Sequence, residues 1–386
     1  MVRGRAESEV ISLAAEIASS AEEDLAALVD VSTPSGDVAA AERAISLCLE
    51  RLPPGMRIER PPCSTAGGAP DLDARLEGRG SARLLLLGHL DTVHDHGAHR
   101  PLEAAGERLY GSGTVDMKGG CVLALGLARV LARQPERFAE LAVLLVTDEE
   151  WRTGELGHVA RFAGYDACLC FEGGELSDDG EEAVVVRRKA AATLRVLARG
   201  EASHSGSAPH RGANALLALA RATIAIAARG DPSGPEQLTI VPTVVRAGDA
   251  FNVVPAAGEL LFDMRARSLE AFEPVLAAVP GELDGVTLRA EFGRRWPGMD
   301  SEEATRPVLA RASELLGRPL RAAARGGASD ASHFAPLIPL TVDGLGPRGG
   351  GAHTPGEFVL RSSLRARAEV ALAVALSALE VAAGGL

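Results

Sequence analysis

Seven side chains of the types that bind metal ions or transfer protons stand at the ends of apolar segments or in glycine-rich turns. They are His89, Asp91, Asp116, Glu149, Glu150, Glu172 and His353. Three predicted strands, at residues 84–87, 141–146 and 166–171, are each followed by one or more members of this set. In an open α/β sheet, functional groups gather beyond the carboxyl ends of the strands. We therefore expect these side chains to meet at one edge of a sheet.

The chemistry of this set is that of a metal site with nitrogen and oxygen ligands. It contains imidazoles and carboxylates but no thiolate, which suits Zn²⁺, Co²⁺ or Mn²⁺. A single catalytic zinc needs about three protein ligands, and this set is large enough for two ions that share one carboxylate. Two cations would also relieve the repulsion among converging carboxylates. Metal ions roughly 3.5 to 4 Å apart are a known arrangement for hydrolysis.

His89 and Asp91 are two residues apart, so in an extended chain their side chains point to the same side. This arrangement suits a metal-bound histidine whose second ring nitrogen is held by a carboxylate. Taken alone, the pair is more typical of a strand end followed by a capping aspartate. The other members of the set favour the metal site.

Apolar spacing predicts an α/β fold. The run at 84–87 does not alternate with polar residues, which is typical of a strand buried on both faces in a covered, largely parallel sheet. From Met117 the apolar residues recur at helical spacing. The chain has 386 residues, and because single cores stop growing at about 250 to 300 residues, two domains are expected.

A smaller domain is predicted to interrupt the first. After a polar turn at 177–180, residues 183–197 alternate apolar side chains with arginines, as a sheet with one solvated face would. The predicted elements then follow the order β-α-β-β-α-β, which suggests an inserted α+β domain of the ferredoxin-like type. We place the insertion at 182–295, between two parts of a catalytic domain at 1–181 and 296–386.

Composition excludes several classes of protein. The net charge of −12 argues against nucleic-acid binding and offers no polybasic surface to a membrane. No apolar run approaches the roughly 20 residues of a membrane span, and residues 1–20 lack the apolar core of a signal peptide. The five cysteines are odd in number and include no Cys-x-x-Cys pair. These features favour a cytoplasmic location.

Six stretches together resemble the M20 family of metallopeptidases. They are GHLDTV, GSGTVDMKGG, TDEE, the strand end at Glu172, ASHSGSAPHRGANA and the segment around His353. This family includes glutamate carboxypeptidases, aminoacylases, acetylornithine deacetylases and succinyl-diaminopimelate desuccinylases. The match covers nearly the whole chain and is closest to the glutamate-carboxypeptidase branch. It implies a zinc-exopeptidase-like mixed sheet covered by helices, with an inserted dimerisation and lid domain.

The resemblance also implies two Zn²⁺ ions per chain, with Co²⁺ or Mn²⁺ as alternatives. Asp116 would bridge the two ions. His89 and Glu172 would complete the protein ligands of one ion, and Glu150 and His353 would complete those of the other.

Two further residues and one peptide bond receive expectations from the same resemblance. Asp91 would orient His89. Glu149 would be the general base, taking a proton from a metal-bridging water and passing it to the leaving amine. The peptide bond from Asp116 to Met117 is expected to be cis.

In the inserted domain, the resemblance implies that His204 stabilises the oxyanion, reaching the site of a partner subunit in a homodimer. Asn252 and Arg265 would hold a carboxylate of the substrate, for which the guanidinium fork is suited. Arg265 also lies in an alternating strand beside Asp263, so a solvated face is the alternative for it. Gly327 belongs to a turn that resembles a pocket-lining loop of the family.

Several nearby residues are expected to stand outside the site. Three histidines in the loop after the main motif, His94, His96 and His99, are expected at the surface. His333 and Glu175 are near enough in sequence to the expected ligands to be their rivals, but neither is expected to bind metal. Trp151 stands where the family often has a Gly-Ser loop, which leaves the identity of the substrate open.

The sequence therefore predicts a hydrolase that cuts an amide bond next to a free carboxylate in a small N-acyl amino acid or peptide. An N-acyl amino acid deacylase is the alternative from the same family. A catalytically silent binding protein on this fold is the alternative from another class. A dinucleotide-binding dehydrogenase is excluded, because no Gly-x-Gly-x-x-Gly follows a strand.

Overall fold

A computed structural model describes residues 2–384, with side chains from residue 7 onward. The chain divides into two compact units. The first contains Met1–Arg187, Asp300–Ala324 and Ser329–Leu386, and the second contains Arg188–Met299 and Arg325–Ala328.

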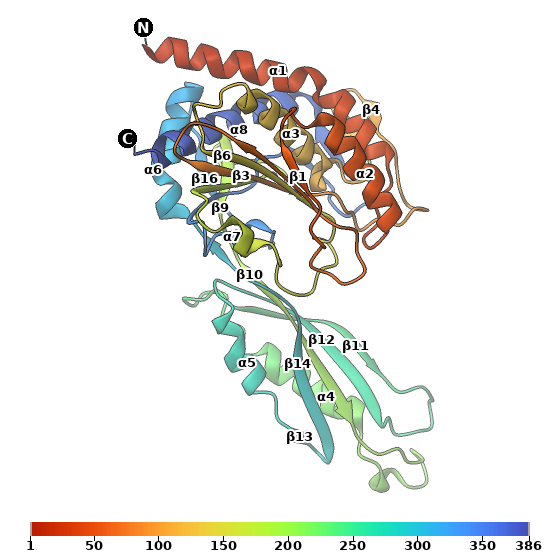
Figure 1. The fold of residues 1–386 in the computed structure, drawn as a ribbon. Coiled ribbons are helices and arrows are strands. Elements are labelled where there is room, and N and C mark those ends of the chain that lie inside the picture. The colour runs from red at the N-terminus through yellow and green to blue at the C-terminus, as the bar shows by residue number, and fades with distance from the viewer. Residues whose placement is uncertain (1, 385–386) are drawn as a thin grey trace. The chain divides into compact units, whose positions relative to one another are not determined.

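The first unit is built on a six-stranded mixed sheet with the strand order β1-β2-β6-β3-β7-β17 (Figure 1). Its strands are β1 (Arg57–Glu59), β2 (Leu72–Glu77), β3 (Arg83–His89), β6 (Glu140–Val146), β7 (Ala167–Cys170) and β17 (Leu340–Val342). The four strands from β6 to β17 pair in parallel, while β1 and β2 are antiparallel. Leu84–Leu87 are fully buried, as the run without alternation predicts. The mixed α/β fold is confirmed.

Helices pack on this sheet in layers (Figure 1). The helices are α1 (Val2–Asp30), α2 (Val38–Arg51), α3 (Gly119–Ala132), α6 (Glu302–Leu316), α7 (Ala331–Phe334) and α8 (Arg361–Ala382). α3 contacts β3 and β6, α8 contacts β7, and α1 packs on both of these helices. α3 is apolar on all sides, which is typical of a helix between two layers. Within the part of the chain that is described, every helix is too short or too polar to cross a membrane.

Two small sheets accompany the main one. One has the order β18-β19-β5-β4, with β4 (Glu103–Ala105), β5 (Arg108–Tyr110), β18 (Gly349–Gly350) and β19 (Phe358–Leu360). The other has the order β15-β9-β16 with β8 on β9, comprising β8 (Glu175–Leu176), β9 (Glu182–Arg188), β15 (Met299–Asp300) and β16 (Arg321–Arg325). The first of these sheets brings the chain around 357 beside the chain around 111, because β19 pairs with β5.

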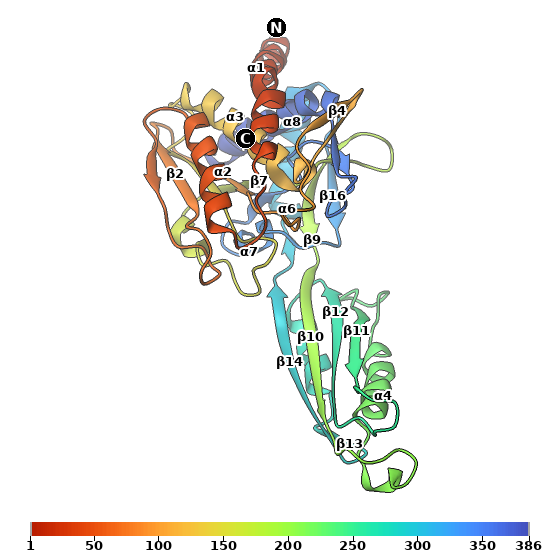
Figure 2. The same cartoon turned by 90° about the vertical axis from the view of Figure 1, so that its right-hand side faces the viewer.

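The second unit is an antiparallel sheet with the order β11-β12-β10-β14-β13 (Figure 2). Its elements are β10 (Ala190–Arg199), α4 (Ala215–Ala227), β11 (Thr239–Ala247), β12 (Ala257–Ala266), α5 (Glu273–Ala277), β13 (Glu282–Leu283) and β14 (Val286–Trp296). Apart from the two-residue β13, the order is β-α-β-β-α-β. Both helices and alternate residues of β10 share one hydrophobic cluster, so the helices cover one face of the sheet.

The main segment of the second unit begins at Arg188 and ends at Met299. Both bounds lie a few residues after the 182 and 295 expected from the sequence. Residues 183–197 look like one alternating stretch, but the chain breaks at Lys189 into β9 and β10. The side chains of 182–186 are all buried, and β9 pairs within a sheet of its own. At the other end, β14 runs on to Trp296, so the second unit ends at Met299.

Candidate metal centre

Ligand-type side chains leave the main sheet at a single edge. His89 is the last residue of β3, and parallel pairing places it beside Val146, the last residue of β6. Glu149 and Glu150 follow β6 in the next loop, and Glu172 follows β7 on the other side of β3. The parallel arrangement therefore brings these side chains to the carboxyl edge of the sheet.

Asp116 reaches this edge from the turn that precedes α3. Gly113 in that turn has a φ of 78°, in the left-handed region that favours glycine. The Asp116–Met117 peptide bond is cis, as expected. A Cβ at Gly120 would lie 1.8 Å from the carbonyl oxygen of Phe171. A glycine at 120 is therefore what lets α3 begin this close to the end of β7.

The side chains form two groups that share Asp116. His89, Asp116 and Glu172 offer ligand atoms within 4.8 Å of one another, and so do Asp116, Glu150 and His353. Asp116 Oδ1 lies 3.0 Å from His89 Nε2, while its Oδ2 lies 3.0 Å from His353 Nε2. His353 Nε2 also lies 3.1 Å from Glu150 Oε1. Each oxygen of one carboxylate is thus turned to a different group.

The electrostatics of these groups suit bound cations. Burial, together with the nearby charge of Asp116, raises the pKa of Glu172 well above its usual value. Burial disfavours the imidazolium of His89, but the carboxylates of Asp116 and Asp91 outweigh it and raise the pKa of His89. Hydrogen bonds to Asp116 and Glu150 raise the pKa of His353 to about 10. A divalent cation in each group would replace these protons as the partner of the carboxylates.

Asp91 has a wider role in the structure than the sequence suggests. His89 Nδ1 lies 3.1 Å from the backbone carbonyl oxygen of Asp91 and 3.4 Å from its Oδ1. The carboxylate itself accepts the backbone N–H groups of Glu149 and Glu150, each at 3.1 Å, and the hydroxyl of Ser35 at 3.0 Å. Asp91 therefore connects His89 to the backbone of the loop that carries two other members of the set.

Glu149 is buried, with 7% of its surface exposed, and belongs to neither ligand group. The rival ligands His333 and Glu175 also lie outside both groups. Its neighbour Glu150 belongs to one of the groups and Glu149 does not, and the general-base role of Glu149 stays a prediction.

One expectation about the surrounding residues is wrong. His94, expected at the surface, is only 8% exposed, and its Nε2 lies 3.6 Å from Glu357 Oε2. Two buried charged residues beside the ligands were missed altogether: Lys118, whose Nζ donates to the carbonyl of Val31 at 2.7 Å, and Glu357. Burial lowers the pKa of Lys118 to about 8. Both residues stand close in sequence to ligands, but nothing in a local pattern reports their burial.

In the second unit, His204 has a defined proton arrangement. The backbone N–H groups of Gly206 and Ser207 donate to His204 Nδ1 at 3.1 and 3.2 Å. The neutral ring therefore carries its proton on Nε2. The side chain is exposed, so this N–H is available as a hydrogen-bond donor.

The other expected substrate contacts also lie in the second unit. Arg265 donates two hydrogen bonds of 3.0 Å to the carboxylate of Asp263 on the same strand. Asp263 is the neighbour that the alternative for Arg265, a solvated strand face, pairs it with. Asn252 is exposed, and its backbone carbonyl accepts the N–H of Ser205. The carbonyl of Gly327 accepts a hydrogen bond of 2.9 Å from Arg188.

Residues 85–377 match the model of peptidase family M20/M25/M40. That match covers well over half of the chain. The chain belongs to peptidase family M20/M25/M40. The family expected from the motifs is thereby confirmed, and with it a hydrolase of amide or peptide bonds.

Similar proteins include a carboxypeptidase and a desuccinylase. Carboxypeptidase G2 of Pseudomonas sp. (strain RS-16) is 28% identical over 362 residues, covering 88% of this chain and 85% of that protein. A succinyl-diaminopimelate desuccinylase of Xylella fastidiosa (strain M23) is 31% identical over 324 residues, covering 75% of this chain and 81% of that protein. The structure of the M20 family metallo-carboxypeptidase Sso-CP2 from Sulfolobus solfataricus shares the fold, with a TM-score of 0.72 at 14% identity over 94% of this chain and 99% of that one.

Proposed function

We propose that this M20 enzyme is a two-zinc hydrolase that cuts an amide bond next to a free carboxylate, in the manner of a glutamate carboxypeptidase. The observation that carries the proposal is Asp116, which turns one oxygen to His89 and the other to His353. A carboxylate shared between two ligand groups suits a pair of ions. The likeness to carboxypeptidase G2 over most of both chains supports the carboxypeptidase assignment.

An N-acyl amino acid deacylase is the second candidate. The likeness to succinyl-diaminopimelate desuccinylases favours it, because the reaction named there removes an acyl group from an amine. The two candidates share their chemistry and differ in which side of the amide is recognised. A catalytically silent binding protein would need no buried carboxylate beside the ligands, and Glu149 is such a carboxylate.

In this proposal His89, Asp116 and Glu172 hold one ion, and Asp116, Glu150 and His353 hold the other. Bound ions would polarise the scissile carbonyl and lower the pKa of water at the site. All five residues supply nitrogen or oxygen, which Zn²⁺ accepts and which also suits Co²⁺ or Mn²⁺.

The protein's own groups would move the protons. The Glu149 carboxylate accepts a proton from the attacking water and delivers it to the nitrogen of the leaving amine. Asp91 holds the backbone N–H of Glu149 and thereby limits where its carboxylate can go. The Nε2–H of His204 donates to the oxygen on which negative charge develops.

The substrate's carboxylate would be held by Arg265 and Asn252, with Gly327 in a loop that lines the pocket. Arg265 already binds a carboxylate in bidentate fashion, that of Asp263. A substrate carboxylate would compete for the same fork. Small N-acyl amino acids or short peptides with a free carboxyl end are the substrates that this arrangement suits.

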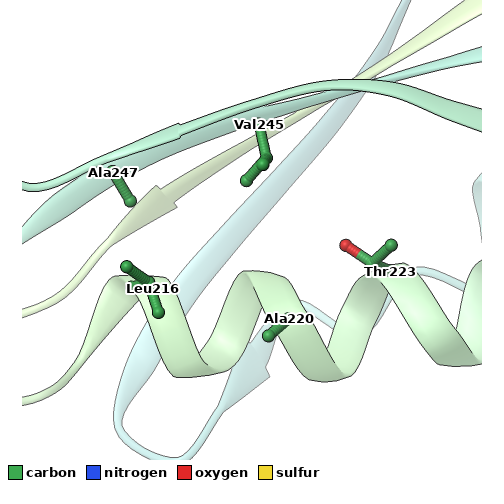
Figure 3. A pocket seen from close by; sticks show the side chains of 5 residues that line it. All are labelled: Leu216, Ala220, Thr223, Val245 and Ala247. Atoms are coloured by element: carbon green, nitrogen blue, oxygen red, sulfur yellow. The ribbon is translucent and has the colours of Figure 1, made fainter.

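We also propose that two chains form a dimer through α4 and β11. β11 is an edge strand, so one side of its backbone is unpaired within the sheet. Five apolar side chains of these two elements are exposed: Leu216, Leu217, Ile224, Val241 and Val245. A pocket of about 440 Å³ between α4 and β11 is lined by Leu216, Ala220, Thr223, Val245 and Ala247 (Figure 3). The mainly apolar lining of this pocket is continuous surface of a kind typical of a protein interface, and a second copy would bury it.

The proposed function is tested by metal content and a substrate screen. Purified metal-replete protein should contain close to two zinc, cobalt or manganese ions per chain by elemental analysis, because the five ligand residues form two groups of three that share Asp116. Hydrolysis is then measured on paired N-acyl amino acids and dipeptides, each with its C-terminal amide as control. We expect cleavage only where the carboxylate is free. One ion or none per chain would overturn the two-metal site, and absence of hydrolysis across the series would favour a binding protein.

The trans role of His204 predicts complementation between two inactive variants. His204→Ala and Glu149→Ala proteins are mixed in equal amounts under conditions of proven subunit exchange. In a symmetric dimer, half of the molecules become hybrids and one of their two sites is intact, so about a quarter of the wild-type activity should return. If His204 acted within its own chain, no site in the mixture would be complete and no activity would return.

A further inference from the structure

Glu357 stands where two ligand-bearing loops meet. It is the residue before β19, and the antiparallel pairing of β19 with β5 sets Phe358 opposite Tyr110. The next residue after β5, Gly111, donates its backbone N–H to the carbonyl of Glu357 at 3.1 Å. Sheet pairing therefore places Glu357 against the turn that carries Asp116.

The carboxylate of Glu357 is buried in that turn. Oε2 accepts the backbone N–H of Gly113 at 2.9 Å, and Oε1 accepts those of Val115 and Asp116 at 2.9 and 3.1 Å. Glu357 is only 2% exposed. Three backbone donors, one of them on Asp116 itself, thus point at a single carboxylate that is 241 residues away in the sequence.

The same residue also closes the end of the loop that carries His353. His353 is four residues before Glu357 and has a φ of 64°, a strained conformation for a residue other than glycine. About half of the His353 side chain is exposed, so packing around it contributes less to its position than the ends of its loop do. Glu357 closes one of those ends against the Asp116 turn.

We propose that Glu357 is a positioning residue that holds the Asp116 turn and the His353 loop in the geometry that binds metal. This inference rests on the proposed function in one respect: it takes Asp116 and His353 to be ligands. Glu357 itself touches no ligand side chain through its carboxylate in the hydrogen bonds described, and acts through the backbone of the turn. Replacing Glu357 should therefore change the affinity of the protein for metal.

The three donors require a carboxylate rather than an amide. Each oxygen of Glu357 faces at least one N–H, and the Nε2 of His94 lies 3.6 Å from Oε2. In Glu357→Gln one oxygen becomes an NH₂ group, which has no lone pair to accept these bonds. At least one backbone N–H would lose its partner inside the protein, and the turn would have to shift to satisfy it.

The experiment compares Glu357→Gln with Glu107→Gln. Glu107 is an exposed glutamate whose carboxylate also accepts a backbone N–H, that of Ser362 at 2.8 Å. It therefore controls for exchanging a carboxylate for an amide away from the turn, where a single oxygen accepts and the amide can replace it. Hydrogen exchange of residues 111–118 is measured by mass spectrometry in the metal-free proteins. Zinc affinity is measured by competition with a chromophoric chelator, and thermal unfolding of the metal-free proteins is followed alongside.

We expect Glu357→Gln to speed exchange in 111–118 and to weaken zinc binding about 10- to 100-fold, the range found for residues that orient metal ligands. Glu107→Gln should match the wild type in both. Unchanged zinc affinity in folded Glu357→Gln would overturn the inference while leaving the two-metal site intact. A wild type that binds no zinc would overturn both. If Glu357→Gln does not fold, Glu357→Asp, which keeps the charge but shortens the reach, is put to the same comparison.

Discussion

Replacing Glu149 with alanine is expected to lower turnover about 10²- to 10⁴-fold, the usual contribution of a general base, while metal content stays at the wild-type value. Glu149 is buried beside the ligands yet belongs to neither group. Its backbone N–H is held by Asp91, so truncating the side chain leaves that hydrogen bond in place. The loop and Glu150 should keep their positions.

Two measurements on the same preparation decide this prediction: kcat on the best substrate of the screen, and metal per chain by elemental analysis. Glu155→Ala is the matched control, because Glu155 is an exposed glutamate in the loop that follows. It should retain both activity and metal. Loss of metal together with activity in Glu149→Ala would reassign Glu149 as a ligand.

Replacing Asp116 with asparagine should reduce binding of both ions at once. Its two oxygens lie 3.0 Å from the two histidines of the two groups, and the amide removes both the negative charge and one oxygen ligand. Activity should fall about 10³-fold or more, because a metal ion contributes several kcal/mol of transition-state stabilisation. Metal content and kcat are measured after dialysis at equal free zinc.

Asp95→Asn provides the control for this change, since Asp95 is an exposed aspartate in the loop after β3 and lies outside both groups. It should bind the same amount of zinc as the wild type. Retention of two tightly bound ions by Asp116→Asn would contradict a shared ligand and would require separate ligand sets for the two ions.

Much of the fold follows from local patterns. The run at 84–87 has no alternation, and it is a central strand buried on both faces. The break between β9 and β10 at Lys189 was not predicted, because the apolar runs on either side of residues 187–189 are both typical of strands. Periodicity reports which residues are buried, but not which sheet a strand joins.

For the site, the sequence alone determined which chemical groups are present and which strand ends carry them. A ligand at the carboxyl end of a buried strand can be recognised because burial leaves a local signature in the residues before it. In this way the sequence alone assigns His89, Glu150 and Glu172 to one edge of one sheet. The resemblance to the M20 family supplied the roles of Asp116 and His353.

Only the tertiary structure decided how these groups are held. The carboxylate of Asp91 accepts hydrogen bonds from the backbone of Glu149 and Glu150. Glu357 holds a turn 241 residues away. Such contacts depend on the conformation of loops and on the pairing of distant strands. A hydrogen bond between residues far apart in the chain leaves no periodic trace in the sequence around either of them.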